Sequence, residues 1–233
     1  EISATFTHYE NEATSAVAID PGDGVVLTPL VFHPGTDAAD EFYTQATASE
    51  NIKLQLVDLE YRRMIPDPAF QIGYVAGARF AHLDQTFGAQ FQNVTTIENV
   101  NSDVQFDGGG VRVGLEADWR SKQTGFLVYS NGYASIVAGS FNSSYTQTDN
   151  FDGTVVSTSR DDARIVPMLD LEVGVGWQTA SGHIRFTGGY AFSGWFNTVT
   201  NRSFIDAVQT GYYDDLSDSL YFDGLVTRVE LKF

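Results

Sequence analysis

Polar and apolar residues alternate one by one over segments of about ten residues, and this period of two constrains the fold more than any other feature of the sequence. Between residues 110 and 120, Val111, Val113 and Leu115 alternate with Arg112 and Glu116. A β-strand points successive side chains to opposite faces, so such a strand has one apolar face and one charged face. The pattern predicts an all-β protein rather than a helical one.

Eight segments follow this pattern, and we expect each to be one strand. Their approximate ranges are 2–10, 52–63, 70–83, 110–120, 124–138, 166–178, 182–196 and 221–233. An even number of amphipathic strands joined in chain order predicts an up-and-down antiparallel transmembrane β-barrel. We expect a single domain over residues 1–233, with ten or more strands if further strands precede Glu1.

Membrane insertion is expected through strands, because the sequence contains no run of roughly 18 apolar residues that could form a spanning helix. Lipid offers no partner to open backbone groups, which requires a closed barrel. Trp119 and Trp177 end two of the strands in the same phase, and Phe233 ends the chain. These three residues are the predicted aromatic girdle, and Phe233 resembles the terminal signal that the outer-membrane assembly machinery reads.

The connections between these segments alternate in length, as expected for a barrel with one short-turn side and one long-loop side. Long extracellular loops are predicted near residues 11–50, 84–104, 140–162 and 198–218, and both termini on the periplasmic side. Apolar residues within 25–32 suggest that the first loop folds inward or docks on a partner. In segment 52–63 the apolar phase slips before Val57, which predicts a bulge or a strand leaving the bilayer.

The charged faces of these strands are assigned to the barrel interior, where they form the predicted lumen charge network. Its members are Asp58, Glu60, Arg62, Arg79, Arg112, Glu116, Asp118, Arg120, Asp170, Glu172, Arg185, Arg228, Glu230 and Lys232. Seven are acidic and seven basic, so removing them from the totals of 30 and 13 leaves 23 acidic and 6 basic residues elsewhere. The interior is therefore expected to be balanced, either as a salt-bridged plug or as a hydrated ion pathway.

Several classes of function are disfavoured by composition. A net charge of -17 opposes binding to nucleic acid, and the absence of cysteine removes thiol chemistry. The four histidines lack metal-ligand spacing, and His82 with Asp84 is only a weak candidate for a hydrolase site at the rim. Acidic clusters such as 37–41, 161–162 and 214–218 lack a recognised calcium-loop spacing. We expect no enzyme, no catalytic residue, no cofactor and no metal.

Three motifs are distinctive: Asp58-Leu59-Glu60-Tyr61-Arg62-Arg63, Gly77 to Gln85 and Gly110 to Glu116. They are continued by Val166 to Gly174, Gly189-Tyr190 and Leu220 to Phe233. Together these motifs resemble the Legionella-type pore-forming major outer-membrane protein family, whose relatives are abundant in planctomycetes. The resemblance covers most of residues 50–233. It implies a barrel in the bacterial outer membrane, in contact with lipid and lipopolysaccharide, with porin-like activity. Members of the family usually carry further strands before the position of Ile2.

Three functional hypotheses follow. The leading one is a small pore or diffusion channel for ions and small solutes across the cell envelope. The alternative is a plugged structural barrel in the same membrane, whose loops bind a protein partner or join a surface assembly. A soluble β-barrel or sandwich has the same periodicity with the faces reversed, and the Trp strand ends, the alternating connections and the terminal Phe disfavour it.

Overall fold

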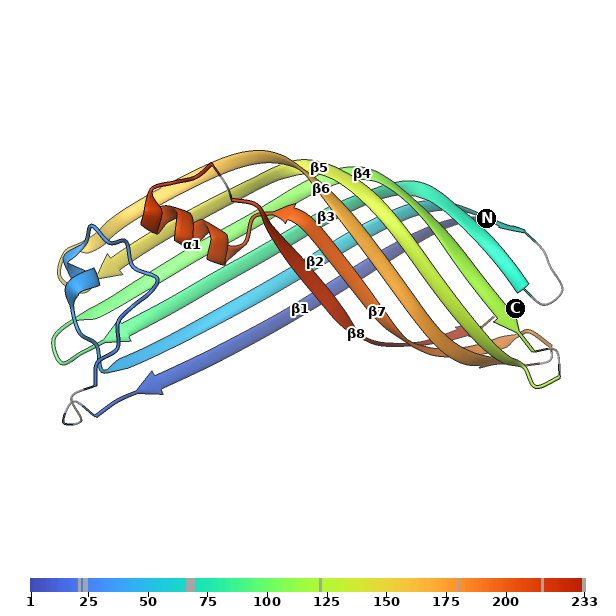
Figure 1. Cartoon of the computed structure of the whole chain (residues 1–233), viewed down its shortest axis with the longest axis horizontal. Coiled ribbons are helices and arrows are strands. Elements are labelled where there is room, and N and C mark those ends of the chain that lie inside the picture. The colour runs from blue at the N-terminus through green and yellow to red at the C-terminus, as the bar shows by residue number, and fades with distance from the viewer. Residues whose placement is uncertain are drawn as a thin grey trace.

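The computed structural model describes residues 1–20, 22, 25–65, 70–121, 123–179, 181–214 and 216–231. One antiparallel sheet dominates it, with its strands in chain order. The strands are β1 (Ile2–Ala18), β2 (Gln45–Ile65), β3 (Phe70–Gln92), β4 (Ile97–Arg120), β5 (Phe126–Asp149), β6 (Gly153–Gln178), β7 (Ile184–Thr198) and β8 (Asp218–Leu231). The all-β, eight-stranded, up-and-down prediction is confirmed, as a sheet curled into a half barrel (Figure 1).

The sheet has two different ends. Both termini lie at one, which we call the terminal end, and the segment joining β1 to β2 lies at the other, which we call the far end (Figure 1). The first connection contains the short 3-10 helix η2 (Asp37–Asp40), and that between β7 and β8 contains the helix α1 (Asn201–Thr210). No helix in the described part of the chain is long and apolar enough to cross a bilayer.

Two of the four predicted long loops are wrong. Residues 84–104 and 140–162 belong mainly to strands that continue to turns around residues 93–96 and 150–152. The loop predicted near 11–50 is shorter than expected, since β1 runs to Ala18 and β2 begins at Gln45. The loop predicted near 198–218 is more ordered than expected, since α1 occupies about half of it. The far-end connections therefore include two short ones.

The sequence prediction missed these strand segments because the apolar face of the strands is not the same along their whole length. On the terminal half of β4, Val111, Val113 and Leu115 point outward and are exposed, opposite inward Arg112. On the far half, Val104 and Phe106 are fully buried inside, while the outward residues are polar. The alternation continues, but its apolar phase moves from the outside to the inside.

The same exchange explains the phase slip in segment 52–63. Leu54 and Leu56 are buried inside, whereas Val57 and Leu59 are exposed outside. The ladders of β2 with both neighbours run through these residues without a register shift. The predicted bulge is therefore wrong, and the alternative of a strand that leaves the bilayer agrees with the observed faces.

The outward apolar residues of the terminal half form a continuous surface that we call the apolar belt. It consists of Ile2, Phe6, Val57, Leu59, Tyr61, Phe70, Ile72, Tyr74, Phe80, Val111, Val113, Leu115, Trp119, Phe126, Val128, Ile136, Ile165, Leu169, Leu171, Val173, Val175, Trp177, Phe186, Tyr190, Leu225, Val229 and Leu231, all exposed. On β4 it spans Val111 to Trp119, close to the roughly 9–11 residues that a tilted strand needs to cross a membrane.

Gly110 lies where the two halves meet, and its missing side chain lets two strands approach closely. A Cβ there would collide with the carbonyl oxygen of Ile136 and lie 2.7 Å from Val137 Cα. At the adjacent Gly109 the nearest atoms belong to the Phe80 ring, at 3.3 Å. A backbone neighbour cannot move aside as easily as a side chain, so the adjacent glycines differ in what they tolerate.

Gly110→Ala is expected to lower the free energy of unfolding by about 1–3 kcal/mol, because overpacking displaces the backbone of β5. Gly109→Ala is the matched control and should change it by less than about 0.5 kcal/mol. Urea unfolding of the detergent-folded protein, followed by tryptophan fluorescence, measures both. Equal effects of the two substitutions would contradict the assignment.

Candidate functional site: a charged cavity beneath an apolar plug

The interior of the terminal half contains a cavity of about 860 Å³. Its wall includes residues from all the strands, so the polar faces of the sheet meet there. The apolar belt covers the opposite face of the same strands. Charged side chains that lipid would exclude therefore point into this space.

The centre of the cavity is a chain of alternating arginines and carboxylates. Arg79 Nε and Nη2 donate to Asp58 Oδ1 and Oδ2 at 2.7 and 2.8 Å, and Arg79 Nη1 donates to Asp170 Oδ2 at 2.7 Å. Arg112 donates to the same Asp170 oxygen and, through Nε, to Glu60 Oε1 at 2.8 Å. Arg79 is only 2% exposed and Asp58 5%. Two buried arginines thus share one carboxylate.

Further pairs extend this network towards the terminal end. Arg62 Nε lies 2.9 Å from Glu116 Oε2, and Tyr133 donates to the other Glu116 oxygen at 2.6 Å. The Arg112 guanidinium lies 4.0 Å from the centre of the Tyr133 ring. Aromatic rings and carboxylates therefore hold these arginines in fixed positions.

Two outer pairs complete the wall. Arg185 donates to both Asp118 oxygens at 2.8 and 3.0 Å and lies 3.8 Å from Glu230. Arg228 Nη2 donates to Glu172 Oε2 at 2.8 Å.

Of the fourteen residues in the predicted network, twelve form ion pairs in the structure. Arg120 lies apart and donates to Gln178 at 3.0 Å, and Lys232 lies outside the described residues. The cavity wall also includes Glu1 and Asp223, which the sequence prediction omitted. Nine acidic side chains therefore face five arginines among the described residues. The expected charge balance is wrong, because strand position alone does not tell which rim charges reach the cavity.

The far half of the interior is filled rather than hollow. Residues 25–44 and 199–214, which we call the plug, contribute Phe32, Tyr43, Val199, Phe204, Ile205 and Val208 to an apolar core. The strands contribute Leu83, Val100, Val104, Phe106, Val137, Phe141, Tyr145, Met168 and Trp195. Phe32, Tyr43 and Phe91 form edge-to-face contacts, with ring centres 4.9–5.7 Å apart. The apolar part of the first loop thus folds inward at Phe32, although Leu30 remains exposed.

Polar contacts fix the plug to the strands. Gln147 accepts from the His33 backbone N–H at 3.0 Å and donates to Thr36 at 3.2 Å. Gln85 donates to the Val199 carbonyl at 3.0 Å, where α1 is about to begin. Thr200 caps the start of the helix and forms a capping box with Ser203, and Gly211, in the left-handed conformation, caps its end.

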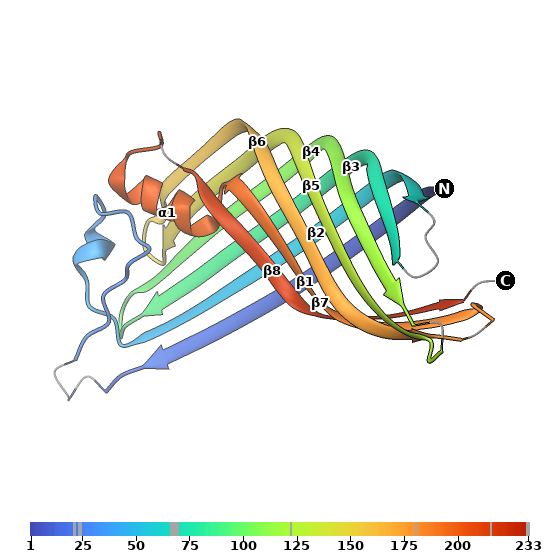
Figure 2. The same cartoon turned by 45° about the vertical axis from the view of Figure 1, so that its right-hand side comes forward.

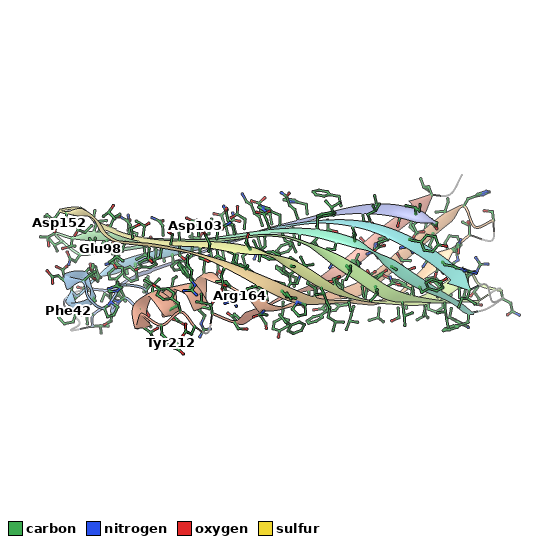
Figure 3. All side chains as sticks on the ribbon, turned by 90° about the horizontal axis from the view of Figure 1, so that it is seen from above. Phe42, Glu98, Asp103, Asp152, Arg164 and Tyr212 are labelled. Carbon is green, nitrogen blue, oxygen red and sulfur yellow. The ribbon has the colours of Figure 1, made fainter. Side chains whose placement is uncertain are left out.

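Glu98 is a buried carboxylate at the far end, well beyond the membrane-spanning part of β4 (Figure 3). It is 2% exposed, and its Oε2 has no hydrogen-bond partner. Burial, together with the negative charges of Asp149 and Glu41, raises the pKa of Glu98 to about 7, although a hydrogen bond with Gln147 opposes this. Glu98 therefore takes up a proton near neutral pH.

Because this pKa is higher in the folded protein than the unfolded value of about 4.5, the contribution of Glu98 to stability should be fully present below pH 4.5 and be lost as the pH rises through 7. Glu98→Gln should therefore be more stable than the parent protein at pH 8, by about 1–3 kcal/mol, and similar to it at pH 4.5. Unfolding at the two pH values measures the difference, with the exposed Glu50→Gln as control. Destabilisation by Glu98→Gln at both pH values would contradict this expectation.

The remaining candidate residues lie apart from the cavity. Trp119 and Trp177 are part of the apolar belt, and Trp177 donates to the Thr124 carbonyl at 2.9 Å. Phe233, the third predicted girdle residue, lies outside the described residues. His82 pairs with Asp107 at 2.8 Å on the outer face, instead of with Asp84. Among the described residues, no three His, Asp or Glu side chains are grouped so that they could hold a metal ion.

Comparison with known families identifies the family of this chain and its cellular location. The family described as the Legionella pneumophila major outer membrane protein precursor matches residues 1–233, which is the whole chain. The chain belongs to this family. Its place is the bacterial outer membrane. Comparisons with curated proteins and with solved structures gave no match.

Membership extends the resemblance beyond residues 50–233 to the first strand. It also explains why the belt faces outward, since a soluble protein would bury such an apolar surface and a membrane barrel turns it towards lipid. The soluble alternative, with its faces reversed, is thereby excluded for the terminal half. On the far half the faces are arranged as in a soluble protein, with the apolar residues inside.

Proposed function

We propose that this outer-membrane protein forms a narrow, cation-preferring channel for ions and small solutes, with the far end on the outside of the cell. The observation that carries the proposal is the charged cavity inside the belt, where acidic side chains outnumber arginines. Carboxylates that line a confined path raise the local concentration of cations and exclude anions. The ion pairs that bridge the cavity leave little free width, so we expect a small conductance.

The plug favours a second candidate function. A barrel whose far half is filled by buried apolar side chains serves as a structural element, and its far end presents exposed apolar side chains to a protein partner. Phe42 and Tyr212 lie beyond one face of the sheet there, as Figure 3 shows, and both are exposed. Lipopolysaccharide is the other contact that we expect at the far end. Recognition of Phe233 by the outer-membrane assembly machinery remains a prediction.

Single-channel recording in a planar bilayer separates the two functions. The purified protein is first shown to be folded by its altered gel mobility without heating, and then recorded across a KCl gradient. The channel predicts small steps with a reversal potential shifted towards that of K⁺. Folded, inserted protein without current would exclude the channel and leave the structural barrel, and a shift towards Cl⁻ would refute the role of the carboxylates.

A further inference from the structure

Glu98 of β4 lies at the far end of the sheet among other carboxylates. Asp149 of β5 is directly opposite it in the β4–β5 ladder, and Glu41 follows η2 in the plug. The negative charges of both act on Glu98, and no basic side chain of the described residues is among the groups that offset them. Like charges opposite each other in a ladder are destabilising. An ionised Glu98 is therefore repelled both from the sheet side and from the plug side.

The carboxyl group of Glu98 is also closed off from water. It is 2% exposed, and its Oε2 has no hydrogen-bond partner. A buried charge that lacks hydrogen bonds costs more free energy than a neutral group in the same place. Among the described residues, Tyr43 and Tyr145 are the other titratable groups that interact with Glu98, and burial raises the pKa of both phenols, so they stay neutral. The protonated form of Glu98 therefore fits this closed site better than the ionised form.

The two neighbouring carboxylates differ in how firmly they are held. Asp149 Oδ1 accepts from the backbone N–H groups of residues 151–153, and these bonds lower the pKa of Asp149. Asp149 is thus ionised at neutral pH and fixed in the turn after β5. Glu41 lies outside the strands and accepts from the Asn93 side chain at 3.3 Å. Glu41 can therefore move away from Glu98 without breaking a strand ladder, whereas Asp149 cannot.

The Gln147 side chain connects Glu98 to residues 25–44, which we call the first plug segment. Its Oε1 accepts from the His33 backbone N–H at 3.0 Å, its Nε2 donates to Thr36 Oγ1 at 3.2 Å, and the same side chain hydrogen-bonds to Glu98. Figure 2 shows the first plug segment, in blue, at the far end of the sheet. Hydrogen bonds to a charged acceptor are roughly twice as strong as those between neutral groups. An ionised Glu98 therefore competes with Thr36 for the Gln147 amide.

We propose that Glu98 is a pH-dependent latch for the first plug segment, which lies against the strands while Glu98 is protonated and moves away when Glu98 is ionised. The movement takes Glu41 away from the repulsion and lets water reach the Glu98 carboxylate. The β4–β5 ladder stays intact, so the change is a local opening and not an unfolding of the sheet. The latch goes beyond the proposed channel, since it sets when the far end is covered, whatever passes through the interior.

The direction of the response follows from the ionisation of Glu98. Its pKa is about 7 in the closed site and about 4.5 where water surrounds it, so a rise in pH favours the open form. Linkage between these two values predicts that opening increases about tenfold or more between about pH 5.5 and 8.5, and levels off above pH 7. In the Glu98→Gln variant this position releases no proton, so its opening is independent of pH.

Cysteine alkylation tests the latch, since the chain has no cysteine of its own. Ala38→Cys reports on the first plug segment, because Ala38 lies in η2 and is 6% exposed. Leu30→Cys, in the same segment and 81% exposed, gives the reaction rate of an open thiol at each pH. Ala81→Cys, in β3 and 4% exposed, reports on loosening of the sheet. Each is made in the parent protein, with Glu98→Gln, and with the exposed Glu50→Gln as matched control.

Alkylation rates are measured on folded protein in detergent and in vesicles, and the Ala38→Cys rate is divided by the Leu30→Cys rate. Between about pH 5.5 and 8.5 we expect this ratio to rise about tenfold or more in the parent and with Glu50→Gln, and to stay constant with Glu98→Gln. Ala81→Cys should stay protected throughout. A constant ratio in the parent, an equal rise with Glu98→Gln, or a parallel rise at Ala81→Cys would overturn the latch.

Amide hydrogen exchange of residues 25–44 is a second readout, which needs no cysteine and serves if Ala38→Cys does not fold. After correction for the intrinsic pH dependence of exchange, protection of this segment should fall at the higher pH in the parent and not with Glu98→Gln. Protection that does not change with pH in the parent would overturn the latch as well. Neither readout needs a current, so the result is independent of the proposed channel.

Discussion

Replacing Arg79 with methionine is expected to lower the free energy of unfolding by about 3–5 kcal/mol, because it leaves a buried carboxylate without its partner. Arg79 provides both hydrogen bonds to the Asp58 oxygens, and the next cation, the Arg112 Nε, lies 3.8 Å away. Asp170 loses one of two arginine donors at the same time. Urea unfolding in micelles measures the loss.

A double variant and an exposed pair test the cause of this loss. Arg79→Met combined with Asp58→Leu removes both charges and should recover most of the stability, because an apolar pair of similar volume can replace a buried ion pair. Lys53→Met breaks an ion pair with Glu10 whose side chains are 45% and 47% exposed, and should cost about 0–1 kcal/mol. If Arg79→Met costs no more than Lys53→Met, water screens the cavity and the buried network does not stabilise the fold.

Replacing residues 20–43 with a short Gly/Ser turn is expected to raise the single-channel conductance several-fold. Ala18 and Gln45 are already paired, so a short turn can join β1 to β2 without moving either strand. The change removes Phe32 and Tyr43 from the far-half core and frees the polar side of Gln147. Ions could then reach the charged cavity from the far end.

Leu30→Ser is the matched control for the plug, since Leu30 lies in the same segment and is 81% exposed. It should leave the conductance unchanged. Gel mobility without heating shows whether the shortened protein still forms its barrel. An unchanged conductance in a folded, shortened protein would mean that ions do not pass through the far half, and would favour the structural role.

The sequence by itself determined the number of strands and their order, and it favoured an outward direction of the belt. Val111 to Trp119 and Leu169 to Trp177 alternate strictly, and an alternating strand allows one apolar face. The sequence also placed most of the charged residues that pair inside, since charges on the polar face of a membrane strand have no other place to go. Family membership agrees with the location of the belt in the outer membrane.

Only the tertiary structure decided where the apolar face changes sides. Residues 84–92 alternate like the belt segments, but their apolar residues Phe87, Ala89 and Phe91 point inward. Period-two alternation gives two faces without saying which is inside, and the covering of a face depends on segments distant in the chain. Here the plug, from residues 25–44 and 199–214, supplies that cover and makes the far half an apolar core beyond the membrane.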